Sequence, residues 1–239
     1  MATEQRQRTA IVTGAASGIG RAASMRLLAD GFRVIGIDLV EASLPGGDLL
    51  IGDAGEPSLL QRAAEAAGGR LDGLICAAGV PPRGPWDDPA RWEETIRVDL
   101  TAPFTALRVL WPALRAARGC VILIGSIVGT VEGSPRSAGY AAAKAGVEGL
   151  ARSAALVGGK DGVRVNVVAP GAIETTFDEP LLSPDARADV PLGRMGSPEE
   201  VAGVIAWLLG PDATYVTGSV VRVDGGRSVL AAADALRKG

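Results

Sequence analysis

The sequence predicts an α/β fold, a doubly wound parallel sheet of about seven strands with helices on both faces, in one domain spanning residues 1–239. Short runs rich in Val, Ile, Leu and Ala alternate along the chain with alanine-rich segments of helical period. Hydrophobic residues make up 47% of the chain and aromatic residues only 4%. Such an interior of small aliphatic side chains suits close packing of helices on a parallel sheet.

The strand runs are expected to be buried on both faces, and they lie at 8–13, 32–38, 48–52, 71–78, 119–126, 163–170 and 219–224. Helical periodicity predicts helices over 18–30, 56–67, 90–117, 138–157 and 198–209, the third of them broken near Pro103. Only nine residues separate Asp38 from the third strand, so no full helix is expected there. Three segments fall outside this pattern: a flexible N-terminus (1–7), a C-terminal tail (228–239) and a proline-bearing segment (172–198) interpreted as a substrate lid.

Composition excludes several classes of function. The net charge is −3 and the charges are interspersed, so no basic stripe for nucleic acid is present. No signal peptide and no apolar run of the roughly 18 residues that a bilayer span needs is found, so a cytoplasmic protein without a membrane partner is expected. Cys76 and Cys120 lie in apolar runs and are predicted to be buried thiols. Without histidine, a Ser-His-Asp triad and the usual metal sites are excluded.

A glycine-rich turn, TGAASGIG, follows the first strand run and opens the first helix. Gly14 would allow the tight turn, and Gly18 would let a pyrophosphate approach backbone N–H groups closely. Gly20 would let the helix pack near the strand. An ordinary glycine turn is the alternative, but an acid about 20 residues further on favours dinucleotide binding.

That acid is Asp38, at the end of the second strand run. Its carboxylate could accept hydrogen bonds from both hydroxyls of an adenosine ribose, and it would repel a 2′-phosphate. No arginine stands at Ser17 or Leu39 to bind such a phosphate. NAD is therefore the expected cofactor and NADP is disfavoured. The alternative interpretation of Asp38 is a solvated acid at a strand end.

With these motifs, the chain resembles the compact type of the short-chain dehydrogenase/reductase family over nearly its whole length. TGAASGIG matches the family's dinucleotide-binding turn, and CAAG (76–79) resembles its NAAG element with Cys76 in place of asparagine. Tyr140 and Lys144 match its YxxxK signature, Ser126 matches its catalytic serine, and VAPGAIET (168–175) resembles its PG element. The resemblance implies a Rossmann-like fold and an oxidoreductase.

The resemblance gives Tyr140 and Lys144 an acid/base role. Helix positions four apart share a face, and a nearby positive charge lowers the pKa of an acid such as the phenol. Tyr140 would exchange a proton with an alcohol or carbonyl oxygen, and Ser126 would hydrogen-bond the same oxygen. Lys144 is implied to bind the nicotinamide ribose as well.

Two further sets of residues are assigned. The residues expected to bind the cofactor are Gly14, Ser17, Gly18, Ile19, Gly20, Asp38, Leu39, Asp53, Ala54, Ala78, Gly79, Tyr140, Lys144, Pro170, Gly171, Ile173 and Thr175. The residues expected to line the substrate site are Val80, Arg83, Trp86, Glu174, Thr176 and Phe177. Trp86 and Phe177 indicate an apolar or cyclic substrate, whereas Arg83 would either pair with a carboxylate or be solvated.

Two departures from the family pattern stand out. Asp99, in RVDLTAPF, occupies the position of the family's catalytic asparagine, which kinks its helix and helps to hold a water on a proton relay. Aspartate is nearly isosteric with asparagine but adds charge and cannot donate a hydrogen bond while ionised. In addition, Ser126 precedes Tyr140 by fourteen residues, about one more than in many members, and a loop with Gly133, Ser134 and Pro135 could absorb the extra residue.

The expected function is the NAD-dependent interconversion of a small secondary alcohol, cyclic or acyclic, and its ketone. One alternative is a 3-oxoacyl carrier-protein reductase, although Asp38 disfavours the NADP that such enzymes usually use. Another is a non-catalytic dinucleotide sensor on the same fold, against which the intact Ser126, Tyr140 and Lys144 argue. The C-terminal segment resembles the region that often forms a tetramer interface in the family, so a homotetramer is expected.

Overall fold

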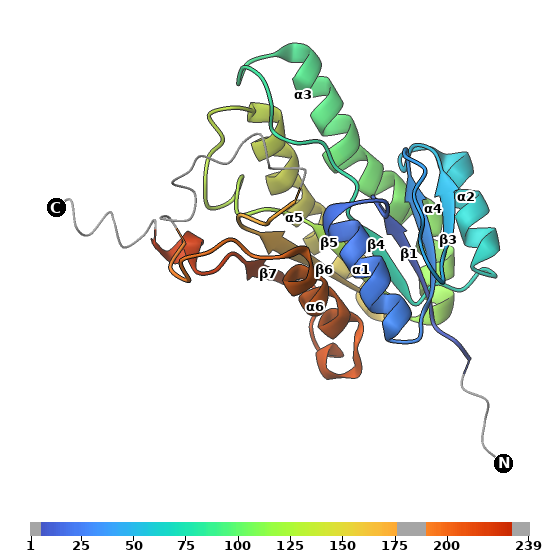
Figure 1. Cartoon of the computed structure of the whole chain (residues 1–239). Coiled ribbons are helices and arrows are strands. Elements are labelled where there is room, and N and C mark those ends of the chain that lie inside the picture. The colour runs from blue at the N-terminus through green and yellow to red at the C-terminus, as the bar shows by residue number, and fades with distance from the viewer. Residues whose placement is uncertain (1–5, 176–189, 231–239) are drawn as a thin grey trace.

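Seven parallel strands form one sheet in the order β3-β2-β1-β4-β5-β6-β7 (Figure 1). The computed structural model describes residues 6–175 and 190–230. Within them the strands are β1 (Thr9–Thr13), β2 (Arg33–Asp38), β3 (Asp48–Ile51), β4 (Gly73–Cys76), β5 (Cys120–Ile124), β6 (Arg164–Pro170) and β7 (Val220–Val223). Each strand lies inside a run predicted from the sequence, so the parallel sheet is confirmed. The strand order reverses between β1 and β4, which makes this the switch point of the fold.

Helices cover both faces of the sheet (Figure 1). They are α1 (Gly18–Ala29), α2 (Pro57–Ala66), α3 (Pro89–Ile96), α4 (Ala102–Ala117), α5 (Ala138–Gly158) and α6 (Pro198–Leu209), with short 3-10 turns at η2 (Gly159–Asp161) and η4 (Pro211–Ala213). Helices α1 and α6 pack side by side on one face, and α2, α4 and α5 lie on the other. None of the helices in the described ranges has the length and apolar character that a bilayer crossing requires.

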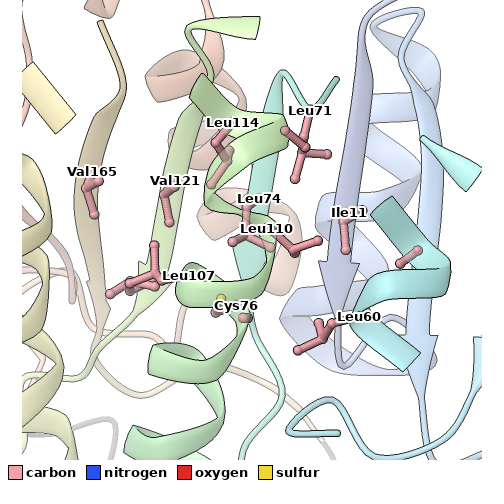
Figure 2. Close-up of a cluster of buried hydrophobic side chains, with 14 of the residues drawn as sticks. Ile11, Leu60, Leu71, Leu74, Cys76, Leu107, Leu110, Leu114, Val121 and Val165 are labelled. Atoms are coloured by element: carbon pink, nitrogen blue, oxygen red, sulfur yellow. The ribbon is translucent and has the colours of Figure 1, made fainter. Parts of the chain in front are cut away.

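The core forms two layers because successive strand side chains point to opposite faces. Ile11 of β1 packs toward α2 and α4 with Leu60 and Leu110, as Figure 2 shows. Its neighbour Val12 belongs to the layer under α1 and α6. Cys76 is free and buried, and so is Cys120, so the prediction of unbonded thiols is confirmed. Burial raises the pKa of Cys76 to about 12, which leaves its thiol protonated and inert at neutral pH.

The connection between β2 and β3 contains no helix, as predicted. Leu44 of this connection is only 7% exposed and belongs to the core layer on the α1 side. A Cβ atom on Gly36 of β2 would lie 3.2 Å from its Cδ2 atom, which shows how closely Leu44 covers the strand. One leucine therefore fills space that a crossover helix would otherwise cover.

The prediction that every strand is buried on both faces is wrong at the edges of the sheet. All residues of the central strand β1 are buried, whereas those of β3 and β7 are partly or fully exposed. Ile51 of β3, for example, is 48% exposed. An edge strand has a neighbour on one side only, so its side chains receive less cover.

The break predicted near Pro103 takes the form of a π-helical turn. The chain stays helical, and Arg97–Thr101 forms a π-helical turn, η1, between α3 and α4. In this wider turn the N–H group of Ala102 donates to the carbonyl of Arg97, five residues back. Pro103 lies in the first turn of α4 and cannot donate a backbone hydrogen bond, and the wider turn before it accommodates that loss.

Helix α6 begins with a capping box. The Ser197 hydroxyl accepts a hydrogen bond from the Glu200 N–H group, and the Glu200 carboxylate accepts one from the Ser197 N–H group at 2.9 Å. Arg194 donates to both oxygens of the same carboxylate, at 2.7 and 2.8 Å. The arrangement holds the start of α6 against the segment that precedes it.

Acidification is expected to remove the contribution of Glu200 to stability. Arg194 and the Ser197 N–H group lower the pKa of Glu200 from 4.5 to about 2. Because the folded pKa is the lower one, the contribution is present above pH 4.5 and is lost as pH falls through about 2. Thermal unfolding of the wild type and of Glu200→Gln should show a Tm difference at pH 7 that closes near pH 2. A difference that stays constant with pH would contradict this assignment.

Candidate active site

A cleft of about 300 Å³ opens at the carboxyl ends of the strands, around the point where the strand order reverses. Its walls come from the segments that follow β1 to β6, from the helical stretch α3–η1–α4 and from the first turns of α5. In open parallel sheets, ligands bind in the crevice at this switch point. The fold therefore places a small-molecule site where the sequence motifs converge.

The glycine-rich turn between β1 and α1 forms one wall. Gly14 has a φ of +71°, and a Cβ atom there would lie 2.8 Å from the backbone nitrogen of Ala78. A Cβ atom on Gly20 would lie 2.1 Å from the carbonyl oxygen of Gly14. Ser17, the N-cap residue of α1, makes no side-chain capping bond to the helix. The first-turn N–H groups of α1 therefore face the cleft without a side-chain cap, which fits a pyrophosphate.

Asp38 lies at the end of β2 and lines the cleft. One carboxylate oxygen accepts a hydrogen bond from the Ala16 N–H group at 2.9 Å, and the other accepts one from the Val40 N–H group at 3.1 Å. These two bonds join the glycine-rich turn to the loop after β2. They fix the carboxylate in the wall of the cleft.

Asp53 lines the cleft beyond β3 and forms an ion pair that sequence reasoning missed. Its carboxylate accepts hydrogen bonds from the Gly55 N–H group at 2.8 Å and from Arg97 at 2.7 Å. The Gly55 N–H group and the Arg97 guanidinium hold the pKa of Asp53 below its ordinary value. Arg97 also lines the cleft, on the π-helical turn. No sequence signal joins residues that stand 44 positions apart.

Ser126, Tyr140 and Lys144 line the opposite part of the cleft. Ser126 follows β5, and its hydroxyl oxygen accepts a hydrogen bond from the Val128 N–H group at 3.1 Å. Ser137 caps α5 by accepting a hydrogen bond from the Tyr140 N–H group at 3.1 Å. Lys144 lies one turn further along, with its Nζ atom 5.4 Å from the centre of the Tyr140 ring. The same ammonium group donates to the carbonyl of Ile124 at 3.1 Å.

Asp99 lies behind this wall and does not line the cleft. Its Oδ1 atom is 3.3 Å from the Lys144 Nζ atom, and both side chains are almost completely buried. The Val80 N–H group donates to the same carboxylate at 3.3 Å. Burial raises the pKa of Asp99 further than Lys144 lowers it, whereas Asp99 and Tyr140 raise the pKa of Lys144 against the effect of burial.

Every residue predicted to bind the cofactor lines the cleft, and so do Ser126 and Val80. Arg83 and Trp86 are exposed and are not among the lining residues. Glu174 lines a second depression instead, with Arg21 and Pro198, because its N–H group bonds to the Gly196 carbonyl and holds it beside the start of α6. Thr176, Phe177 and most of the predicted lid (172–198) lie outside the described residues, as do most of the two terminal segments.

Comparisons with known proteins give a consistent result. Residues 14–228 match a family model described as enoyl-(acyl carrier protein) reductase. The chain is 39% identical to cis-4-hydroxycyclohexanecarboxylate dehydrogenase of Sinomonas cyclohexanicum, over 94% of this chain and 98% of that protein. It is 37% identical to 3-oxoacyl-(acyl-carrier-protein) reductase FabG of Salmonella typhimurium, over 91% and 96%. A crystal structure of a short-chain dehydrogenase/reductase from Burkholderia thailandensis superimposes with a TM-score of 0.88 at 30% identity, covering 98% and 99%.

The sheet, the switch-point cleft and these similarities define a dinucleotide-dependent oxidoreductase that acts on CH–OH groups. The chain belongs to the short-chain dehydrogenase/reductase family. Family membership implies a nicotinamide dinucleotide cofactor, and the glycine-rich wall of the cleft has the shape to hold its pyrophosphate.

Proposed function

We propose that this protein oxidises a cyclic secondary alcohol with NAD, or reduces the corresponding ketone, with Tyr140 as general acid/base. The observation that carries the proposal is the arrangement of the cleft. Ser126, Tyr140 and Lys144 stand on one side of the switch point, and the glycine-rich turn and Asp38 stand on the other. The proposed acid/base residue and the proposed dinucleotide-binding turn therefore line the same cleft.

Each polar side chain has a role in this proposal. Tyr140 takes the hydroxyl proton of the alcohol, or returns a proton to the ketone oxygen. Ser126 donates a hydrogen bond to the same oxygen and favours the negative charge that develops on it. Lys144 lies beside the phenol, so the net charge around its ammonium group affects how readily Tyr140 gives up its proton. A bound nicotinamide supplies the hydride acceptor or donor.

Asp38 supports NAD over NADP. Its carboxylate is fixed in the wall of the cleft, where it would accept hydrogen bonds from ribose hydroxyls and repel a 2′-phosphate. Leu39, which follows it, is 71% exposed and carries no charge. Arg21, on α1, already donates to the carbonyl of Ser43 at 2.6 Å, so its guanidinium has a partner within the protein.

Titration of NAD and NADP against intrinsic tryptophan fluorescence tests this preference. We expect NAD to bind at least about tenfold more tightly, and we expect Asp38→Asn to narrow the difference by removing the charge. Asp30→Asn, which changes an acid paired with Arg26 near the end of α1, is the matched control and should leave the ratio unchanged. Tighter binding of NADP by the wild type would rule out the role given to Asp38.

The cyclic substrate is proposed from two observations. The relative from Sinomonas cyclohexanicum is named for a hydroxylated cyclohexane carboxylate. Trp86, although outside the cleft wall, accepts a hydrogen bond through its carbonyl from the Ala138 N–H group at the start of α5. This places the backbone of Trp86 beside the first turn of α5, which carries Tyr140. NADH formation from a panel of cyclic and acyclic secondary alcohols, with and without a ring carboxylate, should be fastest with cyclic members.

A second candidate is reduction of a 3-oxoacyl group on a carrier protein, supported by the similarity to the Salmonella typhimurium reductase. The two candidates differ in substrate size and in cofactor. The kcat/KM should be measured for a 3-oxoacyl carrier-protein thioester with NADPH and for free alcohols with NAD. A value for the thioester above every value for the alcohols would favour the carrier-protein reductase.

The proposal also includes a cytoplasmic homotetramer. Free thiols at Cys76 and Cys120 suit a reducing compartment. Exposed apolar side chains at Leu156, Val157 and Trp207, on α5 and α6, are suited to subunit contact. Sedimentation equilibrium of the full chain measures the assembly state directly.

A further inference from the structure

Asp99 and Lys144 form an ion pair that is almost completely buried. Lys144 reaches Asp99 at 3.3 Å, and their side chains are 7% and 0% exposed. Gly79 covers Asp99 on the cleft side, since a Cβ atom on it would lie 2.5 Å from the Asp99 carboxylate. Any side chain at position 79 would therefore displace the carboxylate. The sequence places aspartate where the family pattern has an uncharged asparagine.

The charged groups around the pair are few. Tyr140 faces Lys144 from the same helix, and Glu94 on α3 acts on Asp99 from one turn away. The backbone contributes the Val80 N–H group to Asp99 and the Ile124 carbonyl to Lys144. These groups come from α5, η1, α3, the segment that follows β4 and the end of β5.

The charge of the pair follows from counting its protons. The pair has zero net charge when Lys144 is an ammonium and Asp99 a carboxylate. It also has zero net charge when the proton has moved and both groups are neutral. A lysine beside asparagine would instead carry a net charge of +1. Because charges a few ångströms apart in a buried site interact strongly, the phenol of Tyr140 experiences a much weaker positive field in this chain.

We propose that Asp99 is a positioning residue that cancels the charge of Lys144 and so makes Tyr140 ionise at a higher pH than it would beside asparagine. The inference rests on the role proposed for Tyr140 and deepens it. Tyr140 remains protonated over a wider pH range, which favours its work as an acid in ketone reduction. Oxidation of an alcohol, which needs the phenolate, then requires more alkaline conditions.

The composition of the chain allows a direct test. Only two tyrosines are present, and Tyr215 is fully exposed on the surface. In a Tyr215→Phe background, ultraviolet absorbance of phenolate as a function of pH reports Tyr140 alone. We expect Asp99→Asn to lower the Tyr140 midpoint by about 1 unit. Asp99→Ser is a second neutral variant and should lower the Tyr140 midpoint in the same direction if Asp99→Asn fails to fold. Circular dichroism shows which variants are folded.

Glu148→Gln is the matched control. Glu148 is a buried carboxylate on α5, but it pairs with Thr130 at 2.8 Å and with Arg152 at 3.7 Å, not with Lys144. Its replacement should leave the Tyr140 midpoint within about 0.3 unit, below the shift that a close charge produces. An unchanged midpoint in both neutral Asp99 variants overturns the inference, and so does an equal shift in Glu148→Gln.

A second readout separates this inference from the proposed function. With an active alcohol, the acid limb of log kcat/KM against pH should move to lower pH in Asp99→Asn by the same amount as the absorbance midpoint. If no alcohol is turned over but the midpoint still shifts, the proposed function fails and the electrostatic role of Asp99 stands. If turnover occurs and neither quantity shifts, the proposed function stands and the role of Asp99 fails.

Discussion

Tyr140→Phe is expected to lower kcat by about a thousandfold or more, while the Kd for NAD changes by less than about twofold. The loss is large because general acid/base transfer contributes about 10²–10⁴ in rate, and no histidine is present to replace the phenol. Cofactor affinity is retained because phenylalanine keeps the ring beside Lys144 and removes only the hydroxyl. Steady-state oxidation rates and fluorescence titration measure the two quantities.

The control for this variant is Tyr215→Phe, which removes the hydroxyl of the other tyrosine. Tyr215 lies fully exposed before β7, far along the chain from the cleft residues, so its variant should keep wild-type kcat. A Tyr140→Phe protein that still turns over at more than about a tenth of the wild-type rate would place the proton donor elsewhere.

Gly20→Ala is expected to raise the Kd for NAD at least about tenfold and to lower Tm. The new methyl group would lie 2.1 Å from the Gly14 carbonyl oxygen, a contact that only a shift of the glycine-rich turn can relieve. Overpacking of this kind costs about 1–3 kcal/mol, and 1.4 kcal/mol corresponds to a factor of ten in affinity. Calorimetric titration and thermal denaturation are the measurements.

Gly203→Ala is the matched control because it makes the same change in another helix. A Cβ atom at Gly203 would meet only the Arg26 side chain, at 3.9 Å, so α6 has room for it. This variant should bind NAD normally and gain up to about 1 kcal/mol from the better helix propensity of alanine. Normal NAD affinity in a folded Gly20→Ala protein would show that close approach at the turn is not needed for binding.

The sheet and most helices could be predicted because their signals are local. Helix α6, for example, begins at Pro198 and ends at Leu209, the limits that periodicity predicts. The glycine-rich turn and the spacing of Tyr140 and Lys144 are equally local. The sheet edges could not be recognised in the same way, because β3 is as apolar as the central strands and only its place in the strand order exposes it.

The surroundings of the candidate catalytic residues were harder to predict because they depend on one extra residue in a helical turn. The π-helical turn at Arg97–Thr101 holds one residue more than a regular helical turn. The side chains that follow it therefore point roughly 100° away from where an uninterrupted α-helix would direct them, because each residue of an α-helix turns the chain by that angle. The π-helical turn brings Asp99 to Lys144 and Arg97 to Asp53, residues 45 and 44 positions apart. Pro103 indicated that the helix was irregular, but it did not indicate how.

The connection between β2 and β3 has a consequence for how the fold varies in length. Leu44 covers the sheet where a helix of a dozen residues could stand, and the strands on either side keep their regular pairing. The pairing register of β2 and β3 therefore does not depend on what covers this part of the sheet. Hydrogen bonds align the two strands, and an apolar side chain of suitable size can bury the surface above them. Shortening or lengthening such a connection would alter the outline of the molecule next to the Asp38 side of the cleft and leave the side that carries Tyr140 unchanged.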